Sequence, residues 1–168
     1  MTLDELIDAL TYTEAGCGED ALADFERKVG AALPAGYRQF LARCNGGFSR
    51  GRLGVDPSPG LSLDFGICPD HFGGIGRGEV FSLDAMNAMF GRRPSDSWLC
   101  IVSDSMGNGL TLELKGSDRG SVFLFDGGQG AEVGEALGRR AGARMKFANS
   151  FLELVGNIAE LSGDERWW

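Results

Sequence analysis

Residues 103–109 read SDSMGNG and place several residue types that can perform chemistry in one short segment. Ser105 resembles the serine of a G-x-S-x-G nucleophile elbow, but the first glycine is missing and a strand-like run follows where the elbow needs a helix. Asp104 would start a calcium loop, but Lys115 stands at the twelfth position, where calcium needs a bidentate glutamate. The segment therefore predicts a tight turn that Asp104 caps, with its glycines and Asn108 at positive φ.

Two further segments could carry chemistry. The stretch GGIGRGEV at 73–80 has the glycine spacing of a P-loop, but Glu79 stands where a lysine must neutralise phosphate. His71, the only histidine, lies near Cys68, but a zinc site usually shows a second close pair of ligands. We therefore predict no catalytic residue, no metal and no cofactor. Acid–base chemistry stays open for three carboxylates that could meet in space: Asp64, Asp70 and Asp104.

Three helices are predicted in the first third of the chain. The first begins at Thr2, which can form a capping box with Glu5, and has apolar residues at helical spacing. The second contains the run LADFERKV and ends at Gly30. The third follows Pro34 and ends at the NGG of residues 45–47 through left-handed conformations.

The middle of the chain predicts strands and turns. Residues 48–80 are rich in Gly and Pro and indicate an irregular region with one or two short strands, followed by a short helix over 82–90 that its first residue caps. Residues 98–126 contain three strand-like runs with short connections, which only antiparallel neighbours allow, so we expect a β-meander. In its middle run, Thr111 and Glu113 alternate with leucines and predict one solvated face.

The C-terminal part predicts a loop or a weak exposed helix over 127–146, and then a helix whose Phe147, Phe151 and Ile158 face inward. The chain has 168 residues, 43% of them hydrophobic and 24% charged, which is typical of a soluble globular protein. No internal repeat or long linker divides it. We therefore expect one domain over residues 1–168.

Composition limits the function classes. The net charge of −8 argues against nucleic acid and anionic membranes as ligands and favours a basic partner, although such a charge also simply keeps a protein soluble. Four separated cysteines without a C-x-x-C pair fit free thiols in a reducing cytosol. The acidic N-terminus lacks the basic residues of a signal peptide, and no apolar run reaches about 18 residues. We therefore expect a cytoplasmic protein.

Two sequence patterns resemble a known family. The run LADFERKVGAALPAGYRQFLARCNGG is similar to the opening of the SUKH superfamily, in the branch related to the fungal cell-wall-assembly regulator. The run LCIVSDSMGNGLTLELKGSDRGSVFLFD has the family's order of strand, Asp, Gly-Asn turn, alternating strand, Gly turn and closing strand, and FANSFLELVGNI looks like its closing helix. The sequence departs from the family after Asp126, where GGQG replaces an aromatic residue and a histidine, and 127–146 looks longer than usual.

The resemblance implies an α+β domain with N-terminal helices and a C-terminal helix on a mixed, largely antiparallel sheet, usually without enzymatic activity. It also implies that bacterial members are mostly immunity proteins, which bind a toxin in the cytoplasm, often a nuclease or another nucleic-acid-targeting effector. The absence of a catalytic motif, the separated cysteines and the acidity agree with that role. An acidic protein gains association rate with a basic nuclease through electrostatic steering.

We therefore expect an immunity protein that binds a basic toxin, as a monomer or a weak dimer. Its expected contacts are exposed carboxylates of the loops and of the solvated sheet face: Asp56, Asp64, Asp70, Glu79, Asp104, Glu113 and Asp118. Each of these can also be an ordinary solvated turn residue. Two alternatives stay open: a regulatory or scaffold module anchored through Trp167 and Trp168, and an enzyme or small-ligand binder that uses the loops of residues 60–80.

Overall fold

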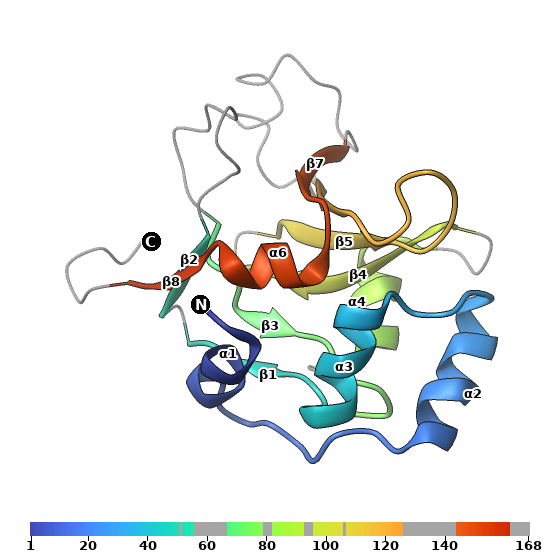
Figure 1. Cartoon of the computed structure of the whole chain (residues 1–168), viewed down its shortest axis with the longest axis horizontal. Helices are drawn as coiled ribbons and strands as arrows, with labels where there is room; N and C mark the ends of the chain where they lie inside the picture. Colours follow the sequence, from blue (N-terminus) through green and yellow to red (C-terminus); the bar gives the residue numbers. More distant parts are fainter. Residues whose placement is uncertain are drawn as a thin grey trace.

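The computed structural model of the chain describes residues 1–50, 52–55, 67–78, 82–92, 96–105, 107–125 and 144–161. Its helices are α1 (Leu3–Ala9), α2 (Glu19–Val29), α3 (Ala35–Arg43), α4 (Leu83–Met89) and α6 (Phe151–Gly156). Its strands are β1 (Gly47–Phe48), β2 (Leu53–Val55), β3 (His71–Phe72), β4 (Trp98–Ser103), β5 (Gly109–Glu113), β6 (Val122–Phe125), β7 (Arg144–Ala148) and β8 (Ile158–Glu160). The predicted α+β class is confirmed (Figure 1).

One six-stranded sheet has the order β1-β3-β4-β5-β6-β7, and its pairs are antiparallel. The strands β2 and β8 pair with each other in a separate antiparallel ribbon. The predicted meander is confirmed, because Leu112 of β5 pairs with Leu99 of β4 on one side and with Val122 of β6 on the other. At the edge of the sheet, Thr11 exchanges two backbone hydrogen bonds with Phe48 of β1, at 2.9 and 2.8 Å.

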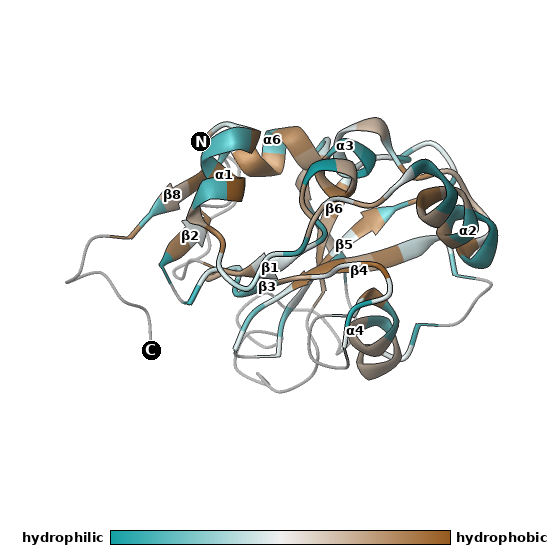
Figure 2. Ribbon diagram, turned by 90° about the horizontal axis from the view of Figure 1, so that it is seen from below, coloured by the Kyte–Doolittle hydropathy of each residue, from teal (hydrophilic) through white to brown (hydrophobic). Residues whose placement is uncertain are grey.

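Helices cover both faces of this sheet, with α1, α3 and α6 on one side and α4 on the other (Figure 2). Buried aromatic rings join the layers on the side of α3 and α6. The rings of Tyr37 and Phe151 meet edge to face at 5.1 Å, and Phe40 lies 5.4 Å from Phe151 and 6.0 Å from Phe72 of β3. This cluster anchors both helices to the sheet. Within the described residues, no helix is long and apolar enough to cross a bilayer.

The helix ends follow the predicted caps. The Thr2 hydroxyl accepts a hydrogen bond from the Glu5 N–H at 3.3 Å, and the Glu5 carboxylate accepts one from the Thr2 N–H at 2.7 Å. The helix α2 ends at Gly30, which has a φ of 71°. After α3, Gly46 has a φ of 77°, and a Cβ there would lie 2.5 Å from the carbonyl oxygen of Phe72. Only glycine fits that position.

The C-terminal part differs from the prediction. Residues 144–148 form the strand β7, because buried Met145 and Phe147 alternate with exposed Lys146, as side chains do along a strand. The closing helix begins only at Phe151, and its last predicted residue lies in β8. The predicted helical placement of Phe147 is therefore wrong. Residues 126–143 lie outside the described residues.

The predicted solvated face of β5 is also wrong. Thr111 is fully buried and Glu113 is 8% exposed. Side chains from other strands cover this face: the rings of Trp98 and Phe125 stack at 5.7 Å, and the Arg144 guanidinium lies 5.8 Å from the Trp98 ring. Sequence alternation within β5 alone does not reveal this cover, because two of the three covering residues come from strands that follow it in the chain.

Candidate partner-binding surface

The seven carboxylates predicted as partner contacts fall into three groups. Asp70 and Asp104 lie at one end of the main sheet, next to β3 and β4. Glu113 and Asp118 lie at the opposite end of β5. The structure therefore does not bring these four together. Three members of the set lie outside the described residues: Asp56, Asp64 and Glu79.

Asp70 and Asp104 are neighbours. The Asp70 N–H donates to the carbonyl of Ser103 at 3.0 Å. The pKa of the Cys68 thiol is raised, chiefly by burial and further by these two carboxylates. Asp70 is 6% exposed, and its carboxylate accepts a hydrogen bond from the Ser49 hydroxyl at 3.3 Å. The expected exposure of Asp70 is therefore wrong, whereas Asp104 is half-buried.

Two cations of β7 pair with the other two carboxylates. Glu113 forms an ion pair with Arg144 at 2.9 Å, and Asp118 forms one with Lys146 at 3.1 Å. Because Glu113 is 8% exposed, its predicted exposure is wrong as well. Asp118 and Lys146 are exposed, and an ion pair in water adds little stability. Asp118 can therefore exchange its cation for one on another protein, and it remains a candidate contact.

The SDSMGNG segment forms the predicted turn, with one difference. The Asp104 carboxylate accepts hydrogen bonds from the Asn108 N–H at 2.7 Å and from its side-chain amide at 2.8 Å, so Asp104 caps the turn as predicted. Gly107 has a φ of 85°, but Asn108 and Gly109 do not have positive φ. Gly109 is crowded instead, since a Cβ there would lie 3.0 Å from the Cys100 sulfur and a neighbouring side chain would have to shift slightly.

The only histidine lies in an aromatic contact. The ring of His71 packs on the ring of Phe48 with 4.7 Å between centroids. Across the described ranges, no three His, Cys, Asp or Glu side chains come close enough to hold a metal ion.

The strongest charge feature of the chain lies at its N-terminus, where sequence reasoning placed no contact. The first 26 residues hold eight of the 24 acidic side chains and none of the 16 basic ones, so their formal charge equals the −8 of the whole chain. The signal was available in the sequence, because counting charges along the chain locates it. These side chains lie on α1, on the loop that follows it and on α2.

Arginines pair with several of these N-terminal carboxylates. The ion pairs are Asp4 with Arg43, Glu14 with Arg77, Glu19 and Glu26 with Arg38, and Asp24 with Arg27. By contrast, Asp8 and Asp20 are exposed and make no ion pair within the part of the chain that the structure describes. These two carboxylates are therefore the acidic groups of this segment most accessible to a cation on another molecule.

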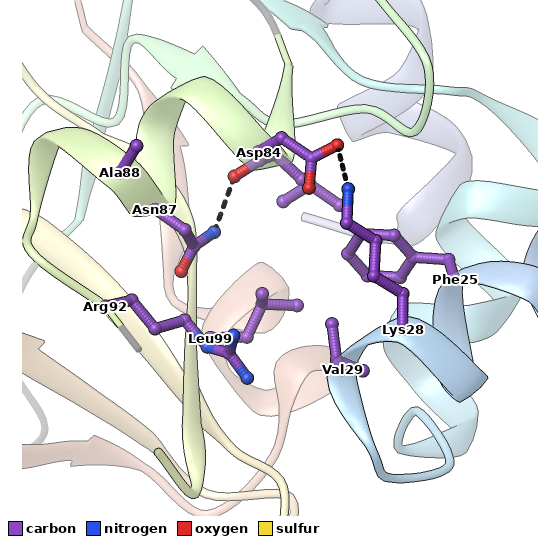
Figure 3. A pocket seen from close by; sticks show the side chains of 9 residues that line it. Phe25, Lys28, Val29, Asp84, Asn87, Ala88, Arg92 and Leu99 are labelled. Atoms are coloured by element: carbon purple, nitrogen blue, oxygen red, sulfur yellow. Dashed lines mark hydrogen bonds and ion pairs between the residues drawn. The ribbon is translucent and has the colours of Figure 1, made fainter. Parts of the chain in front are cut away.

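A pocket lies between α2 and α4 (Figure 3), and its volume is about 180 Å³. Its apolar lining consists of Phe25 and Val29 from α2, Leu83 from α4 and Leu99 from β4. An ion pair of 2.6 Å between Lys28 and Asp84 connects the two helices at the pocket (Figure 3). The helix α4 begins after Ser82, whose hydroxyl accepts from the Asp84 N–H at 3.1 Å, as predicted.

Hydrogen bonds hold the α4 side of the pocket in place. The Asn87 side-chain amide donates to the carbonyls of Leu83 at 2.7 Å and Cys100 at 2.8 Å, and its oxygen accepts from the Cys100 N–H at 2.8 Å. Because Cys100 lies in β4, these bonds fix α4 against the sheet. One wall of the pocket is therefore held in place by the sheet.

Arg92 lines the same pocket and bonds to the backbone of the segment before β4. Its guanidinium donates to the backbone carbonyls of Trp98 and Asp96. It forms no ion pair within the described ranges. Burial lowers its pKa, and the charges of Asp96 and Asp84 act against this shift without cancelling it. An anion brought to this guanidinium would therefore gain a partner that has already lost part of its hydration.

The sequence matches the model of the SMI1 / KNR4 family (SUKH-1) over residues 16–157. The chain belongs to this family. No curated protein shows significant similarity to it. The SUKH-1 family includes toxin immunity proteins, and its members bind partner proteins such as toxins. The matched range includes α2 and α4, which form the walls of the pocket, and it includes Asp20. The helix α1, which carries Asp8, lies before the matched range.

Proposed function

We propose that this SUKH-1 protein is an immunity protein that binds a cognate toxin by direct contact and neutralises it. Family membership supports protein binding as the activity, since SUKH-1 proteins bind partners such as toxins. The observation that supports a basic partner is the concentration of the net charge in the first 26 residues. The partner is a basic protein, and a nuclease or another nucleic-acid-targeting effector has that charge because its substrate is a polyanion.

Electrostatic steering is the physical basis of the proposal. A basic enzyme site attracts carboxylates at long range, and steered association reaches rates far above those of uncharged surfaces. Asp8 and Asp20 provide charge that no arginine neutralises within the described ranges. Asp104 and Asp118 are the two described members of the predicted set that are not buried, and they are proposed as additional contacts.

Co-expression tests the proposal. The protein is produced together with the product of an adjacent gene that is toxic when expressed alone. We expect growth to be restored and a complex of the two proteins to be purified. A toxic neighbour that this protein neither binds nor neutralises would contradict the proposal for that pair.

The association rate then tests the role of charge. In stopped-flow measurements, raising the salt concentration from low to physiological should slow association markedly, because screening shortens the range of the attraction. The double variant Asp8→Asn/Asp20→Asn should associate several-fold more slowly, with a smaller salt dependence. The matched control Glu160→Gln removes an exposed carboxylate of β8 and should associate nearly as the unmodified protein. A salt-independent rate would show that the toxin is not recruited by charge.

A further inference from the structure

The proposed contacts through this protein's own carboxylates do not involve the pocket between α2 and α4. One wall of this pocket is nevertheless held in place by hydrogen bonds. The pocket opens to the surface, because Lys28, Asp84 and Ala88 of its lining are exposed. Here about 180 Å³ stays open while the hydrogen bonds of Asn87 hold α4 on β4. Sites for small organic ligands start at about 300 Å³. The size therefore favours a single side chain over a whole small molecule.

The lining defines the class of side chain. Phe25, Val29, Leu83 and Leu99 are each at most 5% exposed and give the pocket an apolar floor. Ala88 lines the pocket from the exposed side of α4. The next residue, Met89, is not part of the lining and is 75% exposed, so α4 also presents an apolar side chain to solvent. Exposed Met side chains are frequent on surfaces that bind partner proteins.

The charges around the pocket indicate that the ligand also carries a charged group, in addition to its apolar side chain. The two cations of the lining are not equivalent, because Asp84 neutralises Lys28 at 2.6 Å whereas Arg92 bonds only to backbone carbonyls within the described residues. A guanidinium is well suited to pair with a carboxylate. The complementary ligand therefore combines an apolar group with a carboxylate close to it.

We propose that this pocket binds one apolar side chain of a partner protein, from a segment whose neighbouring carboxylate pairs with Arg92. That the partner is a toxin rests on the proposed function, whereas the chemistry of the pocket does not. The acidic segment of residues 1–26 includes most of α2, which forms one wall of the pocket, and this segment repels a carboxylate. One acidic group on a basic partner is therefore accepted at Arg92 and disfavoured along the acidic segment, and this contact fixes the orientation of the complex.

Two matched probes test the chemistry of the pocket. N-acetyl-leucine carries an apolar side chain and a carboxylate, and N-acetyl-leucine amide carries the same side chain without the charge. In ¹H–¹⁵N NMR titrations of the full chain near neutral pH, both should shift amide signals of α2 and α4. The acid should bind about fivefold more tightly than the amide, the ratio that corresponds to an exposed ion pair. Shifts confined to other elements would overturn the proposal.

Variants assign the two contacts. Arg92→Gln should reduce the affinity for the acid to that for the amide, whereas the control Arg27→Gln, on the exposed side of α2, should keep the difference. Ala88→Phe places a large ring at the pocket from an exposed helix position and should abolish binding of both probes, with the thermal transition of the protein preserved. If Arg92→Gln fails to fold, Ala88→Phe still decides whether the probes bind in this pocket.

The toxin complex tests the identity of the occupant. Ala88→Phe should weaken toxin binding at least about tenfold, the loss expected on filling a pocket that receives an anchor residue. If both probes bind in the pocket but Ala88→Phe leaves the toxin affinity unchanged, the site takes a free small carboxylate and the partner-anchor proposal is wrong, while the immunity proposal stands. If no toxic neighbour is bound, the immunity proposal fails and the probe titration still tests the chemistry of the pocket.

Discussion

The Arg50 guanidinium donates a hydrogen bond to the Tyr12 hydroxyl oxygen at 2.9 Å, and both residues have left-handed backbone conformations, with φ of 58° and 53°. No other non-glycine residue of the described ranges has positive φ. The guanidinium carbon also lies 5.1 Å from the centre of the Tyr12 ring. A left-handed conformation costs a non-glycine residue about 1–2 kcal/mol. The side-chain contact therefore joins two strained positions beside the Thr11–Phe48 backbone pair.

This strain predicts an unusual order of stability at position 50. Arg50→Gly removes both the contact and the strain, whereas Arg50→Ala removes only the contact. We expect the glycine variant to be more stable than the alanine variant by about 1 kcal/mol in urea unfolding. Gln39, exposed in α3, serves as the control, because there glycine should be less stable than alanine by about 1 kcal/mol. The same order at both positions would contradict strain at Arg50.

The ion pair between Glu113 and Arg144 predicts a cost for removing one partner. The Arg144 guanidinium lies 4.6 Å from the Phe123 ring, and its Nε and Nη2 atoms are buried without a hydrogen bond in the described structure. Glu113→Gln leaves this cation without its counter-charge, and we expect a loss of about 2 kcal/mol in the free energy of unfolding. Glu113→Gln/Arg144→Met should recover most of it. A double variant as unstable as the single one would show that the charge pairing is not the cause.

Alanine variants at Gly46 and Gly91 distinguish the cost of backbone strain from the cost of steric crowding. Both have positive φ, but a Cβ at Gly46 would lie 2.5 Å from the Phe72 carbonyl oxygen, whereas a Cβ at Gly91 meets nothing within 4 Å. Gly91→Ala should cost about 1 kcal/mol, the strain alone. Gly46→Ala should cost about 3 kcal/mol or more, because the backbone must also move. Thermal unfolding measured by circular dichroism compares the two, and equal losses would contradict the close approach at Gly46.

The thiol of Cys68 predicts a pH dependence. Its pKa is raised by burial first and then by Asp70 and Asp104, so at a given pH less thiolate is present than in an ordinary cysteine. Asp104→Asn removes one negative charge and should lower this pKa. The alkylation rate of Cys68, followed by mass spectrometry, should then rise at lower pH than in the unmodified protein. Cys17, whose pKa is raised by burial and by Glu14, should keep its profile and serves as the internal control.

Local signals explain which elements could be predicted. The helices α1 and α2 carry their boundaries in the sequence, as the Thr2–Glu5 capping box and Gly30 show. The meander is encoded by short connections such as the turn that Asp104 caps. By contrast, β7 was missed because its strand pattern, Met145 and Phe147 around Lys146, is short and follows a segment without a clear period.

The candidate surface depends on long-range relationships that a single pattern does not contain. The burial of Glu113 follows from Arg144 and Trp98, which come from other strands. The pocket requires α2 and α4, whose pairing through Lys28 and Asp84 joins residues 56 positions apart. The acidic N-terminal segment is the exception. Its position could have been found from the sequence, but the total charge alone does not reveal it.

The contact of Thr11 with Phe48 restricts how another protein can use this side of the sheet. An open edge strand offers free backbone N–H and carbonyl groups, to which a strand of a partner or of a second copy can be added. Here the chain's own loop already occupies both groups of Phe48. Main-chain pairing at that residue is therefore closed to other proteins. A partner that approaches β1 must be recognised by side chains, and recognition of that kind can discriminate between related partner proteins.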